Sequence, residues 1–205
     1  MGKHTFDGVE LCFYGHASIC LSSGGKTLYV DPYTVPKGSP KADVILLTHD
    51  HFDHCANVAE LSKPGATIVG TKGCAAKAGL TRSVSEGDRL ELSWVTVEAV
   101  PSYNPDKPFH PRGKGVGYVI TIAGKRFYVA GDTSLIPEMN GLKEILAAFL
   151  PIGGTYTMDM DEAAEAANII KPNYVIPVHY NVIDGTPADP KKFASLVKHS
   201  EVLIL

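Results

Sequence analysis

The chain has 205 residues, 44% of them hydrophobic and 20% charged, a balance that excludes an intrinsically disordered protein. This length predicts one domain, spanning residues 1–205. The net charge of −3 argues against a nucleic-acid or membrane-surface partner, because such partners usually attract a basic protein.

The cellular compartment is indicated by the cysteines and by the lack of long apolar runs. The four cysteines form no C-x-x-C pair and are too sparse for a disulfide scaffold. The first eight residues are polar, unlike a signal peptide, and no apolar run reaches the roughly 18 residues that span a bilayer. We therefore expect a cytoplasmic protein that acts on a small molecule. Its oligomeric state is not defined by the sequence.

Short apolar runs rich in β-branched residues and bounded by Gly, Pro or Asp predict strands along the whole chain. In chain order they are Val9–Tyr14, Ser18–Ser22, Thr27–Val30, Val44–Leu47, Thr67–Val69, Trp94–Val100, Val116–Ile122, Arg126–Val129, Phe149–Ile152, Tyr174–Val178 and Val202–Leu205.

Helical patterns fall between some of these strands. Ala56–Leu61 and Cys74–Ala78 are short. Met160–Ile170 has acidic residues at its start and a proline just beyond its end, and Asp189–Lys198 has a proline in its first turn. Because strands come in runs early and alternate with helices later, we expect an α/β fold with helices outside the sheets.

An internal similarity suggests how the sheets are arranged. The segment 24–31, Gly-Gly-Lys-Thr-Leu-Tyr-Val-Asp, resembles the segment 123–132, Ala-Gly-Lys-Arg-Phe-Tyr-Val-Ala-Gly-Asp. In both, a Gly-Lys turn leads into a strand whose far end carries an aspartate. Two similar halves stacked face to face would give a four-layer α/β/β/α sandwich.

The segment 44–54, Val-Ile-Leu-Leu-Thr-His-Asp-His-Phe-Asp-His, contains the side chains best suited to bind a metal. A buried apolar strand runs directly into three histidines and two aspartates. Divalent metals such as zinc favour imidazole and carboxylate ligands, and a strand end holds those ligands in place. The segment therefore predicts a metal site.

This H-x-H-x-D-H stretch resembles the signature of the metallo-β-lactamase fold superfamily. Asp31, the Gly-Asp-Thr turn at Asp132 and the Pro-Val-His segment ending at His179 match further elements of that superfamily. The segment Gly-His-Ala-Ser at 15–18 is similar to an element of the branch that contains ascorbate-6-phosphate lactonase. The resemblance implies the four-layer αββα sandwich.

The resemblance also implies a ligand set for two metal ions. It places Asp31 behind the ligands, accepting an N–H from a ligand histidine. Tyr180 and Asn181 directly follow the candidate ligand His179, so we expect them to line the substrate site. The implied metals are two zinc ions, with manganese, iron or nickel as alternatives. The implied ligands are His49 and His51 for the first metal, Asp53, His54 and His179 for the second, and Asp132 bridging both.

The sequence departs from the superfamily at one ligand. The superfamily places a third first-site histidine after the strand that here ends at Val100, where this chain reads Pro-Ser-Tyr-Asn. His110 in the same loop is one replacement, and an ordinary exposed histidine is the alternative. His16 is a second candidate, either for this position or as a catalytic group near the metals.

The expected reaction is hydrolysis. A metal-bridged hydroxide, oriented or generated with the help of Asp53, would attack a lactone, ester or phosphodiester bond of a small molecule. Lys107, Arg112 and Lys114 could bind an anionic substrate, although a solvated basic loop explains them as well. Two alternatives remain open: an iron-dependent oxidoreductase on the same fold, and a phosphodiesterase acting on nucleic acid.

Overall fold

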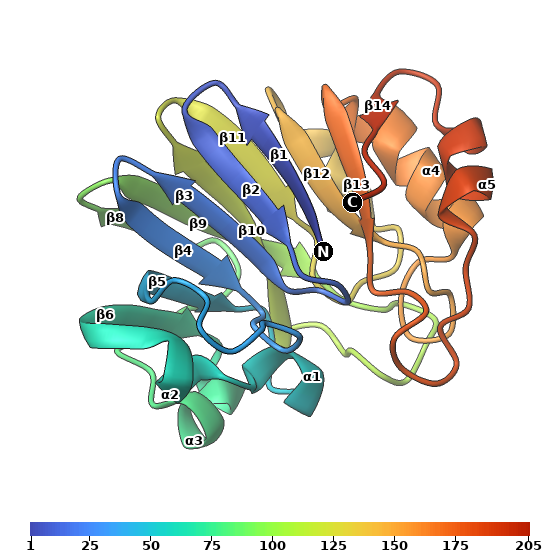
Figure 1. Ribbon diagram of the computed structural model, residues 1–205. Helices are drawn as coiled ribbons and strands as arrows, with labels where there is room; N and C mark the ends of the chain where they lie inside the picture. The colour runs from blue at the N-terminus through green and yellow to red at the C-terminus, as the bar shows by residue number, and fades with distance from the viewer. The chain divides into compact units, whose positions relative to one another are not determined.

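Two seven-stranded mixed sheets contain most of the regular structure, and each lies in its own compact unit (Figure 1). The computed structural model describes residues 1–205. Met1–Ser85 with Leu205 form the N-terminal unit, and Glu86–Ile204 form the C-terminal unit. No helix is long and apolar enough to cross a membrane. The expectation of one domain over the whole chain stays a prediction.

The sheet of the N-terminal unit follows the chain from β1 to β7. Neighbouring strands are antiparallel from β1 to β4 and parallel from β4 to β7. Short helices follow β5 and β6. The elements are β1 Gly2–Phe6, β2 Val9–Phe13, β3 Ile19–Ser23, β4 Lys26–Val30, β5 Ala42–Leu47, α1 Phe52–Cys55, α2 Val58–Leu61, β6 Ser62–Gly70, η1 Lys72–Cys74, α3 Ala75–Ala78 and β7 Arg82–Ser83.

The sheet of the C-terminal unit repeats this plan from β8 to β14. Strands β8 to β11 are antiparallel neighbours, and β11 to β14 are parallel. The elements are β8 Arg89–Leu92, β9 Val95–Ser102, β10 Gly115–Ile122, β11 Lys125–Val129, η2 Pro137–Gly141, β12 Ala147–Pro151, α4 Met160–Ile170, β13 Tyr174–Val178, α5 Pro190–Leu196 and β14 Glu201–Val202.

The repeated plan accounts for the internal similarity in the sequence. Gly24-Gly25 form the β3–β4 turn and Ala123-Gly124 the β10–β11 turn, and both residues of each pair have a positive φ. Two consecutive positive φ values are typical of the tight turns that join antiparallel strands. The predicted likeness of the two halves is therefore confirmed in strand order and direction. It also places the strands that precede Asp31 and Asp132 at equivalent positions in their sheets.

Helix α4 shows how the sequence defines an element. Asp159 accepts a hydrogen bond from the Glu162 amide over 2.9 Å, and the Glu162 carboxylate accepts one from the Asp159 amide over 3.0 Å. This capping box satisfies two amides at the helix start. Lys171 ends the helix in the left-handed region, directly before Pro172. The predicted bounds of this helix are those observed.

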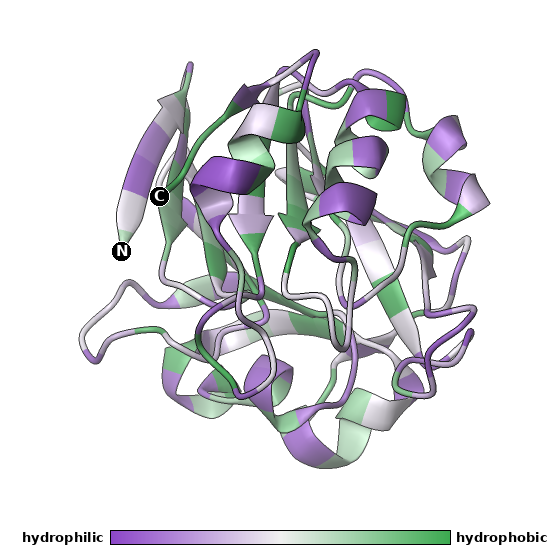
Figure 2. Ribbon diagram, turned by 90° about the vertical axis from the view of Figure 1, so that its right-hand side faces the viewer, coloured by the Kyte–Doolittle hydropathy of each residue, from purple (hydrophilic) through white to green (hydrophobic).

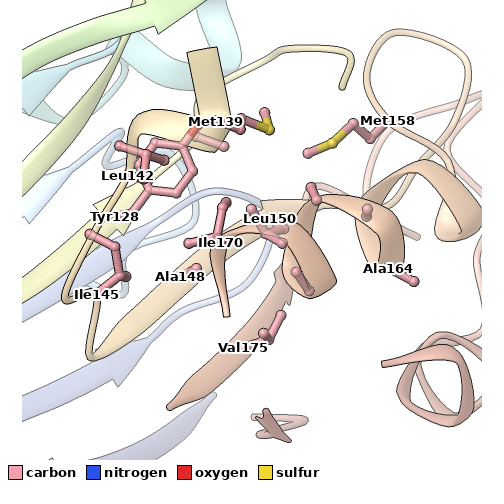
Figure 3. Close-up of a cluster of buried hydrophobic side chains, with 14 of the residues drawn as sticks. Tyr128, Met139, Leu142, Ile145, Ala148, Leu150, Met158, Ala164, Ile170 and Val175 are labelled. Atoms are coloured by element: carbon pink, nitrogen blue, oxygen red, sulfur yellow. The ribbon is translucent and has the colours of Figure 1, made fainter. Parts of the chain in front are cut away.

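The core of the C-terminal unit packs around α4 and the central strands (Figure 3). Small buried side chains such as Ala163 and Ala167 line the inner face of α4, and Leu150 and Val175 from β12 and β13 belong to the same cluster. The helices visible in Figure 2 carry hydrophilic as well as hydrophobic residues, as expected of helices with one buried side. This packing fixes β12 and β13, whose ends lead to candidate site residues.

The predicted strands appear in the structure with ends shifted by a few residues, whereas three strands were not predicted. These are β1, β7 and β8. Strand β1 pairs only with β2, and β7 has two residues. Strand β8 alternates exposed and partly buried residues, so it lacks an apolar run. The last predicted strand, Val202–Leu205, is wrong in extent, because β14 ends at Val202.

Candidate metal centre

In the N-terminal unit, the chain leaves the buried end of β5 and gathers three histidines. The ring centroids of His49 and His51 lie 4.5 Å apart, and those of His49 and His54 lie 4.1 Å apart. His49, Asp53 and His54 are buried, whereas His51 is exposed. Strand β5 is parallel to both of its neighbours, which explains its continuous apolar run and the fixed position of its end.

Asp31 lies at the end of the neighbouring strand β4 and is fully buried. Its carboxylate accepts hydrogen bonds from the Thr48 amide over 2.9 Å, the Thr48 hydroxyl over 2.7 Å and His54 Nδ1 over 2.8 Å. A carboxylate can only accept, so the hydrogen of His54 is on Nδ1 and its Nε2 has the lone pair. This is the contact with a ligand histidine that the sequence predicts for Asp31.

Asp31 also acts on His49, through Thr48. The Thr48 hydroxyl donates its only hydrogen to Asp31, so it accepts from His49 Nδ1, which lies 3.0 Å away. His49 therefore has its lone pair on Nε2, as His54 does. One buried carboxylate thus sets the tautomers of two predicted ligands, which the superfamily resemblance assigns to different metal ions.

His16 lies in the turn between β2 and β3 and contacts Asp53. Its Nε2 is 2.9 Å from an Asp53 carboxylate oxygen, in a hydrogen bond that His16 donates. The ligand atoms of His16, Asp53 and His54 lie within 4.8 Å of one another. The structure therefore places His16 beside the predicted second-site ligands of this unit.

In the C-terminal unit, two histidines face one aspartate. His110 Nε2 lies 3.3 Å and His179 Nε2 3.0 Å from the same oxygen, Oδ2, of Asp132. Asp132 follows β11 and His179 follows β13, and all three side chains are buried. A carboxylate oxygen beside two imidazole nitrogens is a donor set that suits a divalent cation.

Backbone strain accompanies these positions. His16, Asp31 and His179 have φ values of 51°, 46° and 55°, in the left-handed region that costs residues other than glycine about 1–2 kcal/mol. The carbonyl of His179 also requires a glycine beside it, because a Cβ built on Gly153 would lie 2.4 Å from that oxygen. Strained residues of this kind concentrate at functional sites.

The donor atoms fit a divalent metal ion. Two ligands of a tetrahedral zinc ion lie about 3.4 Å apart when each metal–ligand bond is about 2.1 Å. The distance from His54 Nε2 to Asp53 Oδ2 is 3.6 Å, and the two contacts on Asp132 are 3.3 and 3.0 Å. Imidazole and carboxylate donors suit zinc, manganese and iron. Buried carboxylates also need compensating positive charge.

The two residues predicted to bind substrate take part in folding contacts. Tyr180 is partly buried against the core of the C-terminal unit, and this burial raises the pKa of its hydroxyl. The Asn181 amide donates to the Ala188 carbonyl over 2.9 Å and accepts from the Ala188 amide over 3.0 Å. Their substrate-binding role stays a prediction.

The basic side chains of the 107–114 loop also have intramolecular partners. The Lys107 ammonium donates to the carbonyls of Gly154 over 2.7 Å and Thr157 over 2.5 Å. The Arg112 guanidinium lies 2.6 Å from Glu86 and 3.0 Å from Glu138, and the hydrogen bond to Glu86 raises the pKa of Arg112. Lys114 is exposed. Two of the three cations are thus held by the protein itself.

Sequence reasoning missed the side chains that hold the ligands. Thr48 directly precedes the first histidine, at the end of a strand. A hydroxyl at that position could have indicated a partner for the histidine ring. Asn104 accepts from Nδ1 of His110 over 2.9 Å, although the two residues are six positions apart in a loop. The position of Asn104 in the sequence was a usable signal, because it lies close to where the superfamily resemblance expects a histidine.

Comparison with known proteins gives one family match and several full-length relatives. A family model described as beta-lactamase superfamily domain matches residues 10–179. A UPF0173 metal-dependent hydrolase of Thermococcus onnurineus is 35% identical over 216 residues, covering 96% of this chain and 96% of that protein.

Two solved structures align over almost the whole chain. One, from Parabacteroides distasonis and described as a metal-dependent hydrolase, has a TM-score of 0.90 at 32% identity and covers 98% of this chain and 97% of that one. The other, the metallo hydrolase Igni18 of Ignicoccus hospitalis, has a TM-score of 0.82 at 27% identity and covers 96% and 94%. The chain therefore shares the fold of these two proteins, which confirms the predicted α/β class.

Proposed function

Since this chain belongs to the metallo-β-lactamase superfamily and is a metal-dependent hydrolase, we propose that it cleaves a lactone or ester bond of an uncharged small molecule. The membership rests on a family match over residues 10–179 and on relatives that align along the whole chain. The donor atoms described above support metal binding. The substrate class is our inference from the side chains beside those atoms.

We assign the donors to two divalent ions, with zinc as the expected metal. The observation that carries this proposal is the tautomer of the histidines: Asp31 and Thr48 hold His54 and His49 with their lone pairs on Nε2. Asp132, which faces two histidines, is the shared ligand. By the superfamily resemblance, the first ion would take His49 and His51, the second Asp53, His54 and His179, and both Asp132, with His110 as the candidate third histidine of the first.

When bound, such ions act as Lewis acids and lower the pKa of water to about 7, which makes hydroxide available for attack on a carbonyl or phosphoryl centre. The protein's own side chains hold the ions and orient the nucleophile. Asp53 would accept a proton or orient the nucleophile, and His16 holds Asp53 by its 2.9 Å hydrogen bond. His16 is thus proposed as a catalytic partner of Asp53.

The charges beside the ligands favour an uncharged substrate over a phosphodiester. An anionic substrate is usually bound by available lysine or arginine side chains. Lys107 is held by two carbonyls, and Arg112 is paired with Glu86 and Glu138. A phosphodiester would have to compete with those contacts or rely on Lys114, the third cation of this loop, which is exposed.

Exposed apolar side chains close in sequence to the candidate ligands also favour an uncharged substrate. Phe52 follows His51 in the sequence and is 66% exposed, and Phe109 precedes His110 and is 41% exposed. Val182, three residues after His179, is 47% exposed. Exposed apolar side chains this close in sequence to candidate ligands suit contact with the apolar part of a substrate.

The proposal is tested by metal analysis together with turnover of matched substrates. Purified protein is stripped with a chelator and reloaded with zinc, manganese or iron. It is then assayed with p-nitrophenyl acetate, p-nitrophenyl hexanoate, an aliphatic γ-lactone and bis-p-nitrophenyl phosphate. We expect about two ions per chain and faster turnover of the longer ester and the lactone than of the phosphodiester. Asp132→Ala, which removes the shared ligand, is the inactive reference.

Other results would reject parts of the proposal. One ion or none at saturating metal would remove the two-ion assignment. Phosphodiester turnover that exceeds ester and lactone turnover would overturn the substrate class while leaving the hydrolase assignment in place.

A further inference from the structure

The loop after β9 is built around a contact between Asn104 and His110. Strand β9 ends at Ser102, and β10 begins at Gly115. The Asn104 amide donates to the His110 carbonyl over 2.8 Å, which brings the two ends of the segment 104–110 together. Both side chains are buried, Asn104 with 5% and His110 with 6% exposure. The loop is therefore ordered from within.

The orientation of the Asn104 side-chain amide follows from its neighbours. The backbone N–H of His110 points to Oδ1 over 3.2 Å, so this atom is an acceptor. On the other side, Nδ2 donates to the Ser134 hydroxyl over 3.0 Å. Oxygen and nitrogen of the amide are thereby assigned by contacts that do not involve the His110 ring.

The ring of His110 is then held in one tautomer by two acceptors. Its Nδ1 lies 2.9 Å from Asn104 Oδ1 and 3.1 Å from the Tyr156 carbonyl, which can only accept. Nδ1 therefore has the hydrogen and Nε2 the lone pair. Nε2 is the atom that lies 3.3 Å from Asp132 Oδ2.

The second acceptor is itself held in place. Lys107 donates to the carbonyls of Gly154 and Thr157, on either side of Tyr156. The rings of Phe109 and Tyr156 meet edge to face, with centroids 4.8 Å apart. Together with the His110 contact to the Tyr156 carbonyl, four contacts thus join the loop that holds His110 to the loop that holds Tyr156.

We propose that Asn104 is a positioning residue that presents His110 Nε2 as a metal ligand beside Asp132, in the role that the resemblance gives to a third first-site histidine. This inference rests on the two-ion site of the proposed function. The superfamily resemblance expects that histidine close to the end of the strand. Here Asn104 lies near that place. It contacts both the backbone and the imidazole ring of His110, which lies further along the loop.

The test measures zinc affinity in four variants, by competition with a chromophoric chelator. Asn104→Leu keeps the size of the side chain and removes the acceptor, whereas Asn104→Asp keeps the acceptor oxygen. His110→Ala is the reference for loss of the ligand. Asn168→Leu is the matched control, because Asn168 also uses both ends of its amide, on Leu196 and Lys198, within the same unit.

We expect Asn104→Leu to weaken one of the two ions about 10- to 100-fold, as is typical when a partner of a ligand histidine is lost. His110→Ala should weaken the same ion at least as much. Asn104→Asp should retain most of the wild-type zinc affinity. Asn168→Leu should lower the free energy of unfolding without changing zinc binding. A folded Asn104→Leu protein that binds both ions like the wild type would overturn the inference.

A second measurement does not depend on any variant. The ¹⁵N chemical shifts and couplings of the His110 ring in the metal-free wild-type protein report which nitrogen carries the hydrogen. Hydrogen on Nδ1 supports the proposal, and hydrogen on Nε2 overturns it. Failure of the wild type to bind zinc would instead reject the proposed function, so the two failures are distinguishable.

Discussion

Asp31 accepts a hydrogen bond from Nδ1 of His54 over 2.8 Å, across 23 positions of sequence. The same carboxylate accepts the Thr48 hydroxyl, which in turn accepts from His49. An aspartate at the end of one strand therefore orients histidines that follow the end of the next. This arrangement is possible because β4 and β5 are parallel neighbours whose ends lie at the same edge of the sheet.

Replacing Asp31 tests whether this carboxylate serves metal binding. We expect Asp31→Asn to lower the affinity for both ions about 10- to 100-fold, because one of the donors that face the carboxylate then meets an NH₂ group. Asparagine tolerates the φ of 46° at this position, so the backbone is spared. Chelator competition and calorimetry measure the affinities.

The control for this prediction is Thr48→Val, which keeps the shape of the side chain. It interrupts the path from Asp31 to His49 and leaves the contact with His54. We expect it to weaken the first ion more than the second. Equal loss at both ions in Thr48→Val would contradict the separate paths.

The sequence predicts much of this site because its main elements are local. The segment His49–His54 lies just after an apolar strand, and Asp132 and His179 each follow the end of a recognisable strand. The repeated Gly-Lys turn indicates two halves of like topology, which the strand order confirms.

The parts that were not predicted depend on tertiary contacts. The pairing of His16 with Asp53 joins residues 37 positions apart, and no local pattern encodes it. Asn104 and Thr48 matter through the side chains they meet rather than through a motif. Strands β1 and β8 alternate in exposure without an apolar run, so only their pairing with a neighbour identifies them.

His16→Asn distinguishes a catalytic role from a ligand role for His16. Asparagine keeps a donor and tolerates the φ of 51°, but it is too short to hold Asp53 as the imidazole does. We expect turnover to fall about 100-fold or more, as is typical of lost acid–base help, with two ions still bound at saturating zinc. Loss of one ion from this variant would show that His16 is a ligand instead.

Gly153→Ala tests how closely the backbone must approach His179. The added Cβ would lie 2.4 Å from the His179 carbonyl and 2.9 Å from Thr186 Cβ, so the backbone has to move. We expect a loss of about 1–3 kcal/mol in the free energy of unfolding and weaker binding of the ion assigned to His179. Gly141→Ala is the control, because no atom lies within 4 Å of its built Cβ. Equal stability and zinc affinity in the two variants would contradict this prediction.

The pH dependence of stability is predicted at Asp43, in β5 and away from the ligands. Burial opposes the ionised form, but hydrogen bonds from the ammonium groups of Lys63 and Lys26 and from the Thr27 amide lower the pKa of the Asp43 carboxyl to about 2. The unfolded value is about 3.9. A lowered pKa in the folded state stabilises the protein above the unfolded pKa, and this contribution is lost as the pH falls through about 2.

Asp43→Asn should therefore lower the free energy of unfolding of the metal-free protein by about 1 kcal/mol at pH 7, a modest amount because solvent screens the partly exposed lysines. The difference from the wild type should shrink as the pH is lowered from about 4 to about 2. Denaturant unfolding at several pH values, with chelator present throughout, measures it. Asp184→Asn, at an exposed loop position, should show no such narrowing. The prediction is wrong if the difference in free energy of unfolding between Asp43→Asn and the wild type stays constant down to pH 2. The two lysines would then not stabilise the folded state through this carboxylate.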